Sequence, residues 1–135
     1  ETSFDYDDAG RVTAQTMPDT GGTRTIAFDY DDNGNMTSLT PPGRPAHGFT
    51  YTDVNREEDY APPQPSPAIP DPRTVSAWNG DRQLDLVSRP DGKTVDPGYD
   101  FAGRLQTLSV QPAGETSVYA YDPNTGELES VTGPD

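Results

Sequence analysis

The chain has 135 residues, a formal net charge of −14, 13 glycines, 15 prolines and no cysteine. The negative charge repels nucleic-acid phosphates and anionic lipid surfaces, so we expect neither as a partner. Without cysteine there are no disulfides or thiolate metal sites, and no apolar run reaches the roughly 18 residues that predict a membrane span. Only 30% of the residues are apolar, which predicts a thin core.

Six units of similar sequence follow one another along the chain. In each, an aromatic residue is followed by an acidic, amide or hydroxyl residue and then by a turn. These aromatic residues lie 24, 21, 27, 21 and 22 positions apart: Tyr6, Tyr30, Tyr51, Trp78, Tyr99 and Tyr121. Periods of this length indicate repeats that bury a core only by stacking on their neighbours. We therefore expect residues 1–135 to form a single repeat array.

Each unit is predicted to be a β-hairpin. Phe28 and Tyr30 are spaced i, i+2, which places both on one face of a strand, and the residues that follow include Asn33-Gly34, a strong hairpin-turn signal. The corresponding turn glycines elsewhere are Gly10, Gly103 and Gly126. Asn55 takes this position in the third unit, since Asn tolerates a positive φ. In the fourth unit, residues 78–84, we expect a compressed turn.

Further turns separate the units, at residues 18–22, 41–43, 90–92 and 112–114. The two kinds of turn in alternation predict an all-β antiparallel meander of ten to twelve short strands. Helix is not expected, because Pro and Gly interrupt every candidate segment. A Pro-rich loop at about 60–73 shows no strand alternation and is predicted to be an extended, polyproline-like excursion within the array.

Disorder is the alternative that low hydrophobicity and high charge suggest. Regularly spaced aromatic residues preceded by β-branched ones argue against it, as in Thr25–Phe28 and Thr116–Tyr119. We therefore expect a folded chain.

The repeated motif resembles the YD repeat of Rhs proteins and teneurins. It is clearest at Tyr99–Leu105, with relatives at 6–12, 30–36 and 121–128 and a variant at 78–92. In that family, long runs of repeats form a β-sheet that spirals into a hollow shell, often around a C-terminal toxin in bacterial members. The resemblance implies a curved or spiralling sheet, part of such a β-shell, in a secreted or cell-surface protein.

The chain also departs from a complete member of that family. It has six units, and it lacks the self-cleaving carboxy-terminal region and a toxin domain. Because it begins at Glu1 without an initiator Met, we expect a processed or excised piece of a longer protein.

Mechanical roles are expected for the repeated residues. The tyrosines are predicted to form a structural ladder, each packed beside its neighbours with its hydroxyl on a polar partner. Arg11, Arg104 and Arg82 are candidates to pair with Asp residues of an adjacent unit. Asn35 and Glu127 break this pattern, so the pairing is optional.

Calcium binding is the sharpest chemical alternative. Asp29, Asp31 and Asn33, followed by Gly34, match the opening of an EF-hand loop. The twelfth position is Thr40 rather than a bidentate Glu, and no helices are expected beside the loop. A plain hairpin turn is favoured, with no cofactor.

No enzymatic activity is expected. The single histidine, His47, lies among turn residues, where a structural or exposed role is favoured over general-base catalysis. Glu57, Glu58 and Asp59 are adjacent acids that alternate faces on a strand, so they do not place two carboxylates across a cleft.

Two functions remain open. The favoured one is a non-enzymatic segment of the β-shell wall of an Rhs-type protein, whose partners are neighbouring repeats and an enclosed toxin. The alternative is an extracellular adhesion or glycan-binding module, self-assembling into a fibre through its unpaired edge strands.

Overall fold

The computed structural model describes residues 1–64 and 71–134. Within these ranges every strand belongs to an antiparallel pairing and there is no helix, so none is long and apolar enough to cross a membrane. The chain forms two compact units, Glu1–Arg73 and Thr74–Asp135. The predicted Pro-rich loop at about 60–73 begins inside a strand, and its residues 65–70 lie outside the described residues.

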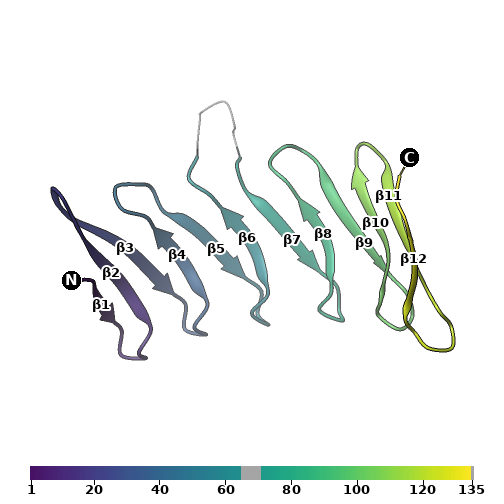
Figure 1. The fold of residues 1–135 in the computed structure, drawn as a ribbon, viewed down its shortest axis with the longest axis horizontal. Helices are drawn as coiled ribbons and strands as arrows, with labels where there is room; N and C mark the ends of the chain where they lie inside the picture. Colours follow the sequence, from purple (N-terminus) through teal and green to yellow (C-terminus); the bar gives the residue numbers. More distant parts are fainter. Residues whose placement is uncertain (65–70, 135) are drawn as a thin grey trace. The chain divides into compact units, whose positions relative to one another are not determined.

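The first unit is a six-stranded antiparallel meander in which each strand pairs with the next (Figure 1). Its strands are β1 (Ser3–Tyr6), β2 (Val12–Asp19), β3 (Gly22–Tyr30), β4 (Met36–Thr40), β5 (His47–Tyr51) and β6 (Glu57–Ala61).

The second unit repeats this arrangement. Its strands are β7 (Thr74–Trp78), β8 (Leu84–Ser88), β9 (Thr94–Tyr99), β10 (Leu105–Gln111), β11 (Glu115–Tyr121) and β12 (Leu128–Thr132). The prediction of an all-β antiparallel meander is confirmed. Each odd-numbered strand ends at the repeated aromatic residue, which we call the ring residue.

A β-bulge recurs at one place in every hairpin. In the first, Tyr6 pairs with Val12 whereas Asp5 pairs with Ala14, which leaves Thr13 without an opposite residue. The other five hairpins have the same irregularity beside the ring residue. The extra residues are all polar: Thr13, Thr37, Glu58, Asp85, Gln106 and Glu129. Since a bulge bends its strand and increases the local twist, each hairpin has local curvature built in.

Successive repeats within each unit also share one register. The residue three positions after the start of an even-numbered strand lies opposite the residue four positions before the next ring residue. The pairs are Gln15 with Ile26, Leu39 with His47, Val87 with Val95, and Leu108 with Ser117.

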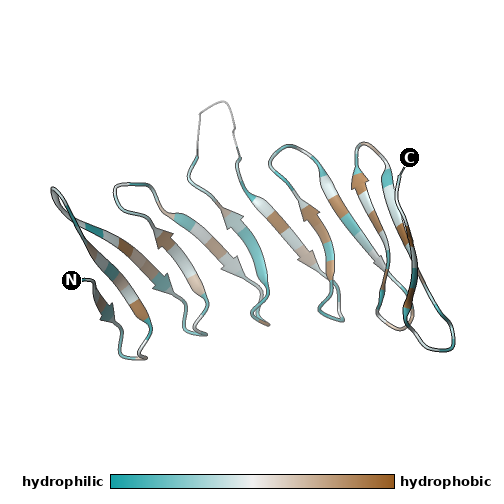
Figure 2. Ribbon diagram, in the orientation of Figure 1, coloured by the Kyte–Doolittle hydropathy of each residue, from teal (hydrophilic) through white to brown (hydrophobic). Residues whose placement is uncertain are grey.

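This register gives the sheet of each unit two different faces, because residues opposite one another in an antiparallel pair share a face. The ring face carries the ring residues with aliphatic and aromatic neighbours, including Val12, Ile26, Phe28, Met36, Leu84, Val87, Leu105 and Leu108. The other face carries small residues, including Ala14, Thr16, Thr25, Ser38, Ala77, Thr107 and Ser109. Figure 2 shows the alternating bands of apolar and polar residues along the strands.

The core is as thin as the composition predicts. Among the described residues no hydrophobic side chain is fully buried, and Pro97 is the one residue largely hidden from solvent. On the small-residue face, hydroxyl pairs join neighbouring strands: Thr16 to Thr25 and Ser109 to Thr116, each at 3.0 Å between oxygens. Polar contacts therefore have a large share in holding the sheet together.

The turns share a left-handed residue four positions after the ring residue, or five in the last turn. The φ values there are 78° at Gly10, 88° at Gly34, 60° at Asn55, 63° at Arg82, 78° at Gly103 and 75° at Gly126. The prediction for Asn55 is confirmed. The prediction of a compressed fourth turn is wrong, because Arg82 instead of Gly80 takes the left-handed position and the turn keeps its usual length.

We predict that Gly10→Ala destabilises the chain by roughly 1–2 kcal/mol, the cost of a left-handed backbone for a residue with a Cβ. A Cβ at Gly10 would meet nothing within 4 Å, so no steric clash contributes. Arg82→Gly should stabilise it by about 1 kcal/mol for the same reason. Denaturant unfolding of each variant beside the parent chain would measure these two changes.

Gly21→Ala is the matched control, because Gly21 has no positive φ and equally open surroundings. Equal losses of stability in the Gly10 and Gly21 variants would contradict the assigned backbone requirement.

Candidate functional site

The residue that follows each ring residue, here called the turn-opening residue, organises the turn. Oδ1 of Asp7 accepts hydrogen bonds from the backbone N–H of Ala9 at 3.0 Å and of Arg11 at 2.9 Å. The same two bonds recur at Asp31, Asn79 and Asp100. An Asp or Asn side chain of this length can cap its own turn, which explains why these residue types recur at this position.

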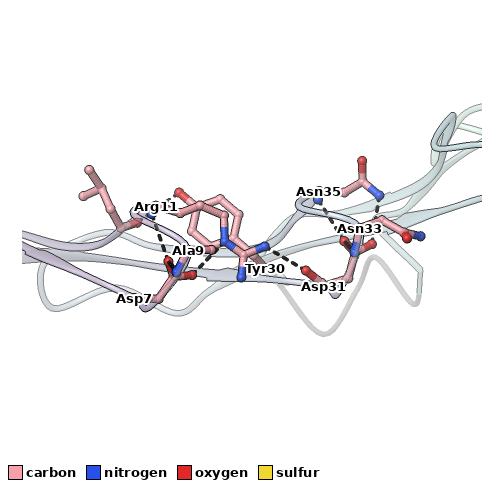
Figure 3. A network of polar contacts seen from close by, with 8 residues as sticks. Asp7, Ala9, Arg11, Tyr30, Asp31, Asn33 and Asn35 are labelled. Carbon is pink, nitrogen blue, oxygen red and sulfur yellow. Dashed lines mark hydrogen bonds and ion pairs between the residues drawn. The ribbon is translucent and has the colours of Figure 1, made fainter.

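The residue after the left-handed position, the turn-closing residue, connects the turn to the next repeat. Nε of Arg11 lies 2.7 Å from Oδ2 of Asp7. Its Nη1 donates to the carbonyl of Asp31 in the next repeat at 2.9 Å, and its guanidinium lies 4.8 Å from the centre of the Tyr30 ring. One side chain thus contacts its own turn, the following turn and the following ring (Figure 3).

The fifth repeat has the same arrangement. Arg104 pairs with Asp100 at 2.7 Å, donates to the carbonyl of Gly126 at 3.2 Å and lies 4.3 Å from the centre of the Tyr121 ring. The planar, five-donor guanidinium suits such a site, since it stacks on a ring while its edge donates to a carboxylate and a carbonyl.

Amide side chains make the same two turn contacts in other repeats. Nδ2 of Asn35 donates to Oδ2 of Asp31 at 2.9 Å and to Oδ1 of Asn55 in the next turn at 2.8 Å. Gln83 accepts from Nδ2 of Asn79 at 3.1 Å and donates through Nε2 to the carbonyl of Gly103 at 2.8 Å. Asn35 therefore does not break the pattern. It replaces a charged link with a neutral one.

The ring hydroxyls complete the contact between repeats. Four tyrosine ring residues donate to the carbonyl of the residue that follows the turn-closing residue of the preceding repeat. The bonds are Tyr30 to Val12 at 3.0 Å, Tyr51 to Met36 at 2.9 Å, Tyr99 to Leu84 at 3.0 Å and Tyr121 to Leu105 at 2.8 Å. The structure thus gives these hydroxyls the polar partners that the ladder hypothesis requires.

Two details differ from the sequence-based expectation. The arginine–aspartate pairs lie within one turn rather than between adjacent units, because the turn brings its first and fifth residues together. Arg82 is not one of the pairing residues, since it takes the left-handed position and Gln83 closes the turn. The role of Gln83 could have been predicted from its position relative to the ring residue Trp78, which matches that of Arg11 relative to Tyr6. Its residue type gave no such indication.

Hydrogen bonds lower the pKa of turn-opening carboxyls. For Asp7 the largest cause is the backbone N–H of Arg11, followed by its guanidinium. For Asp100 the backbone N–H and then the side chain of Arg104 lower the pKa in the same way. Both carboxyls are therefore held in the charged form.

The pKa of Asp31 is lowered chiefly by the side-chain amide of Asn35, and that of Asp122 chiefly by the backbone N–H of Thr125. Because each folded-state pKa lies below the unfolded value, these carboxylates contribute their full stability above about pH 4. The contribution is lost as the pH falls through the folded-state pKa.

The three calcium candidates belong to different parts of the hairpin. Asp29 is an exposed residue of β3, whereas Asp31 and Asn33 belong to the turn. Both carboxylate oxygens of Asp31 already accept hydrogen bonds from that turn. No group of three metal-ligating side chains occurs in residues 1–64 and 71–134.

His47 lies on the ring face of the first unit, in an aromatic group with Phe49 and Tyr60. Its Nδ1 is 2.8 Å from the Tyr60 hydroxyl, and the Tyr60 ring stacks on both His47 and Phe49 with centroid distances of 5.9 and 5.2 Å.

The acidic cluster lies in β6, where Glu57 and Glu58 are exposed and Asp59 is partly buried. Oδ2 of Asp59 pairs with Arg73 at 3.0 Å. Arg73 also pairs with Asp71 at 3.1 Å, so the structure places Asp59 in an ion-pair network.

Within each unit, ring hydroxyls reach back to the preceding hairpin and turn-closing side chains reach forward to the next one. Such a meander of mutually linked hairpins defines a β-hairpin repeat protein. The chain belongs to the teneurin YD-shell family, whose sequence model matches residues 1–133. The resemblance to the YD repeats of Rhs proteins and teneurins is thereby confirmed.

Solved structures share the fold. TcdB2-TccC3-Cdc42 matches with a TM-score of 0.72 and 20% identity, and TcdB2-TccC3 without its hypervariable C-terminal region matches with 0.69 and 20%. TcdB2-TccC3-TEV matches with 0.63 and 11%. Each alignment covers 98% of this chain but only 7%, 7% and 9% of the respective matched chain. A search of curated proteins gave no match.

We predict that Arg104→Lys lowers the free energy of unfolding by about 0.5–1 kcal/mol. Lysine keeps the charge but loses the planar contact with the Tyr121 ring and the fork that joins two acceptors. Thermal unfolding measures the change. Arg44→Lys is the control, since the Arg44 side chain has no polar contact among the described residues, and it should melt like the parent.

We also predict a pH-dependent loss in Asp100→Asn. The parent chain should be more stable than the variant at neutral pH and should lose this advantage below about pH 4, as Asp100 becomes protonated. The two chains are compared at each pH, because the titration of all their other groups is then common to both and cancels in the difference. Asp8→Asn is the control of equal charge change, because Asp8 lies at an exposed turn tip and accepts none of the hydrogen bonds described for its turn. An equal loss of stability in both variants would contradict the role of Asp100.

Proposed function

We propose that this chain is a non-enzymatic segment of the wall of a YD shell, and that its repeated residues serve to couple one hairpin to the next. The observation that carries this proposal is the recurring contact between repeats. Four ring hydroxyls bind the same backbone position of the preceding hairpin. Groups committed to such contacts are unavailable as ligand contacts, which favours wall over binding module.

The chemistry of the sheet supports the same function. Only a thin apolar layer is present, so each hairpin depends on its neighbours in the way that repeat proteins do. The acidic surface keeps such a sheet soluble.

The parent protein is proposed to be a secreted or cell-surface protein of the bacterial Rhs type, with the shell enclosing a toxin. The resemblance to Rhs repeats supports this. One matched assembly is also described as lacking a hypervariable C-terminal region, and we propose a comparable variable region, the toxin, in the parent of this chain.

A glycan-binding or adhesive module is the competing function. It is favoured by aromatic side chains that remain open to solvent, above all Tyr6 at 60% and Phe101 at 115% relative exposure. These are the first ring residue and a turn tip, rather than one continuous row.

Tyr30→Ala separates the two functions. Under the wall proposal it removes a ring that contacts Arg11 and a hydroxyl bound to Val12, and it should destabilise the chain by roughly 3–5 kcal/mol, as large aromatic deletions do. Circular dichroism melts measure this. In the parent protein, the same substitution should make the region beyond the repeats sensitive to protease.

Phe101→Ala is the matched control, because its side chain is fully exposed and should leave the melt unchanged. A Tyr30→Ala chain that melts like the parent and loses binding on a glycan array would replace the wall proposal with the glycan-binding one.

A further inference from the structure

The dipeptide Asn-Gly occurs twice in this chain, at different positions of two equivalent turns. Asn33-Gly34 forms the tip of the turn between β3 and β4, whereas Asn79-Gly80 opens the turn between β7 and β8. The side-chain amide of an asparagine before glycine is open to attack by the next backbone nitrogen, since glycine has no Cβ to block the approach. The two sites differ in what holds the asparagine side chain.

The Asn79 side chain is held by three hydrogen bonds. Its Oδ1 accepts from the backbone N–H of Asp81 at 3.0 Å and of Gln83 at 2.9 Å, and its Nδ2 donates to Oε1 of Gln83 at 3.1 Å. Ring closure onto the nitrogen of Gly80 has to rotate the amide out of these bonds. The turn that Asn79 opens therefore also protects its amide.

The Asn33 side chain is not held in this way. The residue is exposed, and its side chain has no hydrogen-bond partner among residues 1–64 and 71–134. Its backbone N–H alone is bound, to Oδ1 of Asp31 at 3.0 Å (Figure 3). The attacking nitrogen, that of Gly34, donates to the carbonyl of Asp31 at 3.1 Å. Reaction at Asn33 thus has to open one hydrogen bond instead of three.

We propose that Asn33 is a site of spontaneous covalent modification, deamidation through a cyclic succinimide, and that Asn79 is protected from it. The nitrogen of Gly34 forms a bond to Cγ of Asn33, the bond from Cγ to Nδ2 breaks, and the amide leaves as ammonia with the proton of the Gly34 N–H. Water then opens the ring at either carbonyl, which gives aspartate or isoaspartate.

This modification goes beyond a role in a shell wall. The nucleophile and the amide belong to neighbouring residues of one turn inside the first unit, and such proximity replaces an external reagent. Water is the one co-reactant, so neither a partner protein nor a free sheet edge is needed.

Isoaspartate at position 33 loosens the link between the second and third repeats. It routes the main chain through the former side chain and so adds one carbon before Gly34, which displaces the left-handed position. Asn35 moves with it, and the Asn35 amide is the group that joins Asp31 to Asn55. Aspartate, by contrast, keeps the backbone and adds only a negative charge to the turn.

The test follows deamidation of the folded 135-residue chain at mildly alkaline pH. Peptide mass spectrometry reads each asparagine separately. We expect Asn33 to react roughly tenfold to a hundredfold faster than Asn79, because reaction at Asn79 has to break about two more hydrogen bonds. In urea that unfolds the chain, the two sites should react at similar rates.

Gln83→Ala is the matched variant for the protected site. It removes the partner of Nδ2 of Asn79, so Asn79 should react severalfold faster while Asn33 keeps its rate. Circular dichroism verifies that the variant is folded.

The consequence for the turn is measured on the isoaspartate form, isolated by chromatography. It should melt at a lower temperature than Asn33→Asp, which carries the same charge on an unaltered backbone. An isoaspartate form that melts like Asn33→Asp would overturn the assigned effect on the link between repeats.

Equal rates at Asn33 and Asn79 in the folded chain would overturn the proposal. So would a difference that persists in urea, since it would then come from the neighbouring sequence instead of the fold. These failures leave the wall proposal standing, because that proposal depends on the melting of Tyr30→Ala.

Discussion

Within each of its two units, the structure depends on a hydrogen-bonded contact that passes from one hairpin to the next. A turn-opening Asp or Asn fixes the turn, the turn-closing side chain reaches the following turn, and the following tyrosine donates back to the first hairpin. Asp7, Arg11 and Tyr30 show the full arrangement. Since no hydrophobic side chain is fully buried among the described residues, burial alone does not set the geometry, and these directional contacts do.

Charged and neutral versions of this contact coexist in one chain. Asp31 with Asn35 and Asn79 with Gln83 keep the positions of the donors while removing one or both charges. The important property is therefore a donor that reaches the next turn, with charge as an addition. The same reasoning explains why an exposed ion pair, worth little by itself, recurs here: the arginine also holds a carbonyl and a ring.

The sequence predicted much of this because turn chemistry is local. Aromatic spacing, the turn glycines and Asn55 predicted the hairpins and their number correctly. The sequence failed where a position matters more than the residue filling it, as with Arg82 in a left-handed backbone and Gln83 in the place of arginine. The bulged residues, such as Thr13, were also not predicted, because no particular residue type marks the extra position in a strand. The roles of the repeated residues in a shell remain a proposal.

The last turn contains one residue more than the others, between Asp122 and Glu127, yet Tyr121 still pairs with Leu128 and its hydroxyl still reaches Leu105 at 2.8 Å. Length variation is thus absorbed at the tip without disturbing the strands. The turn tips are therefore natural places to graft a peptide epitope or a fluorescent label, and an array of such hairpins would display the grafts at intervals set by the repeat.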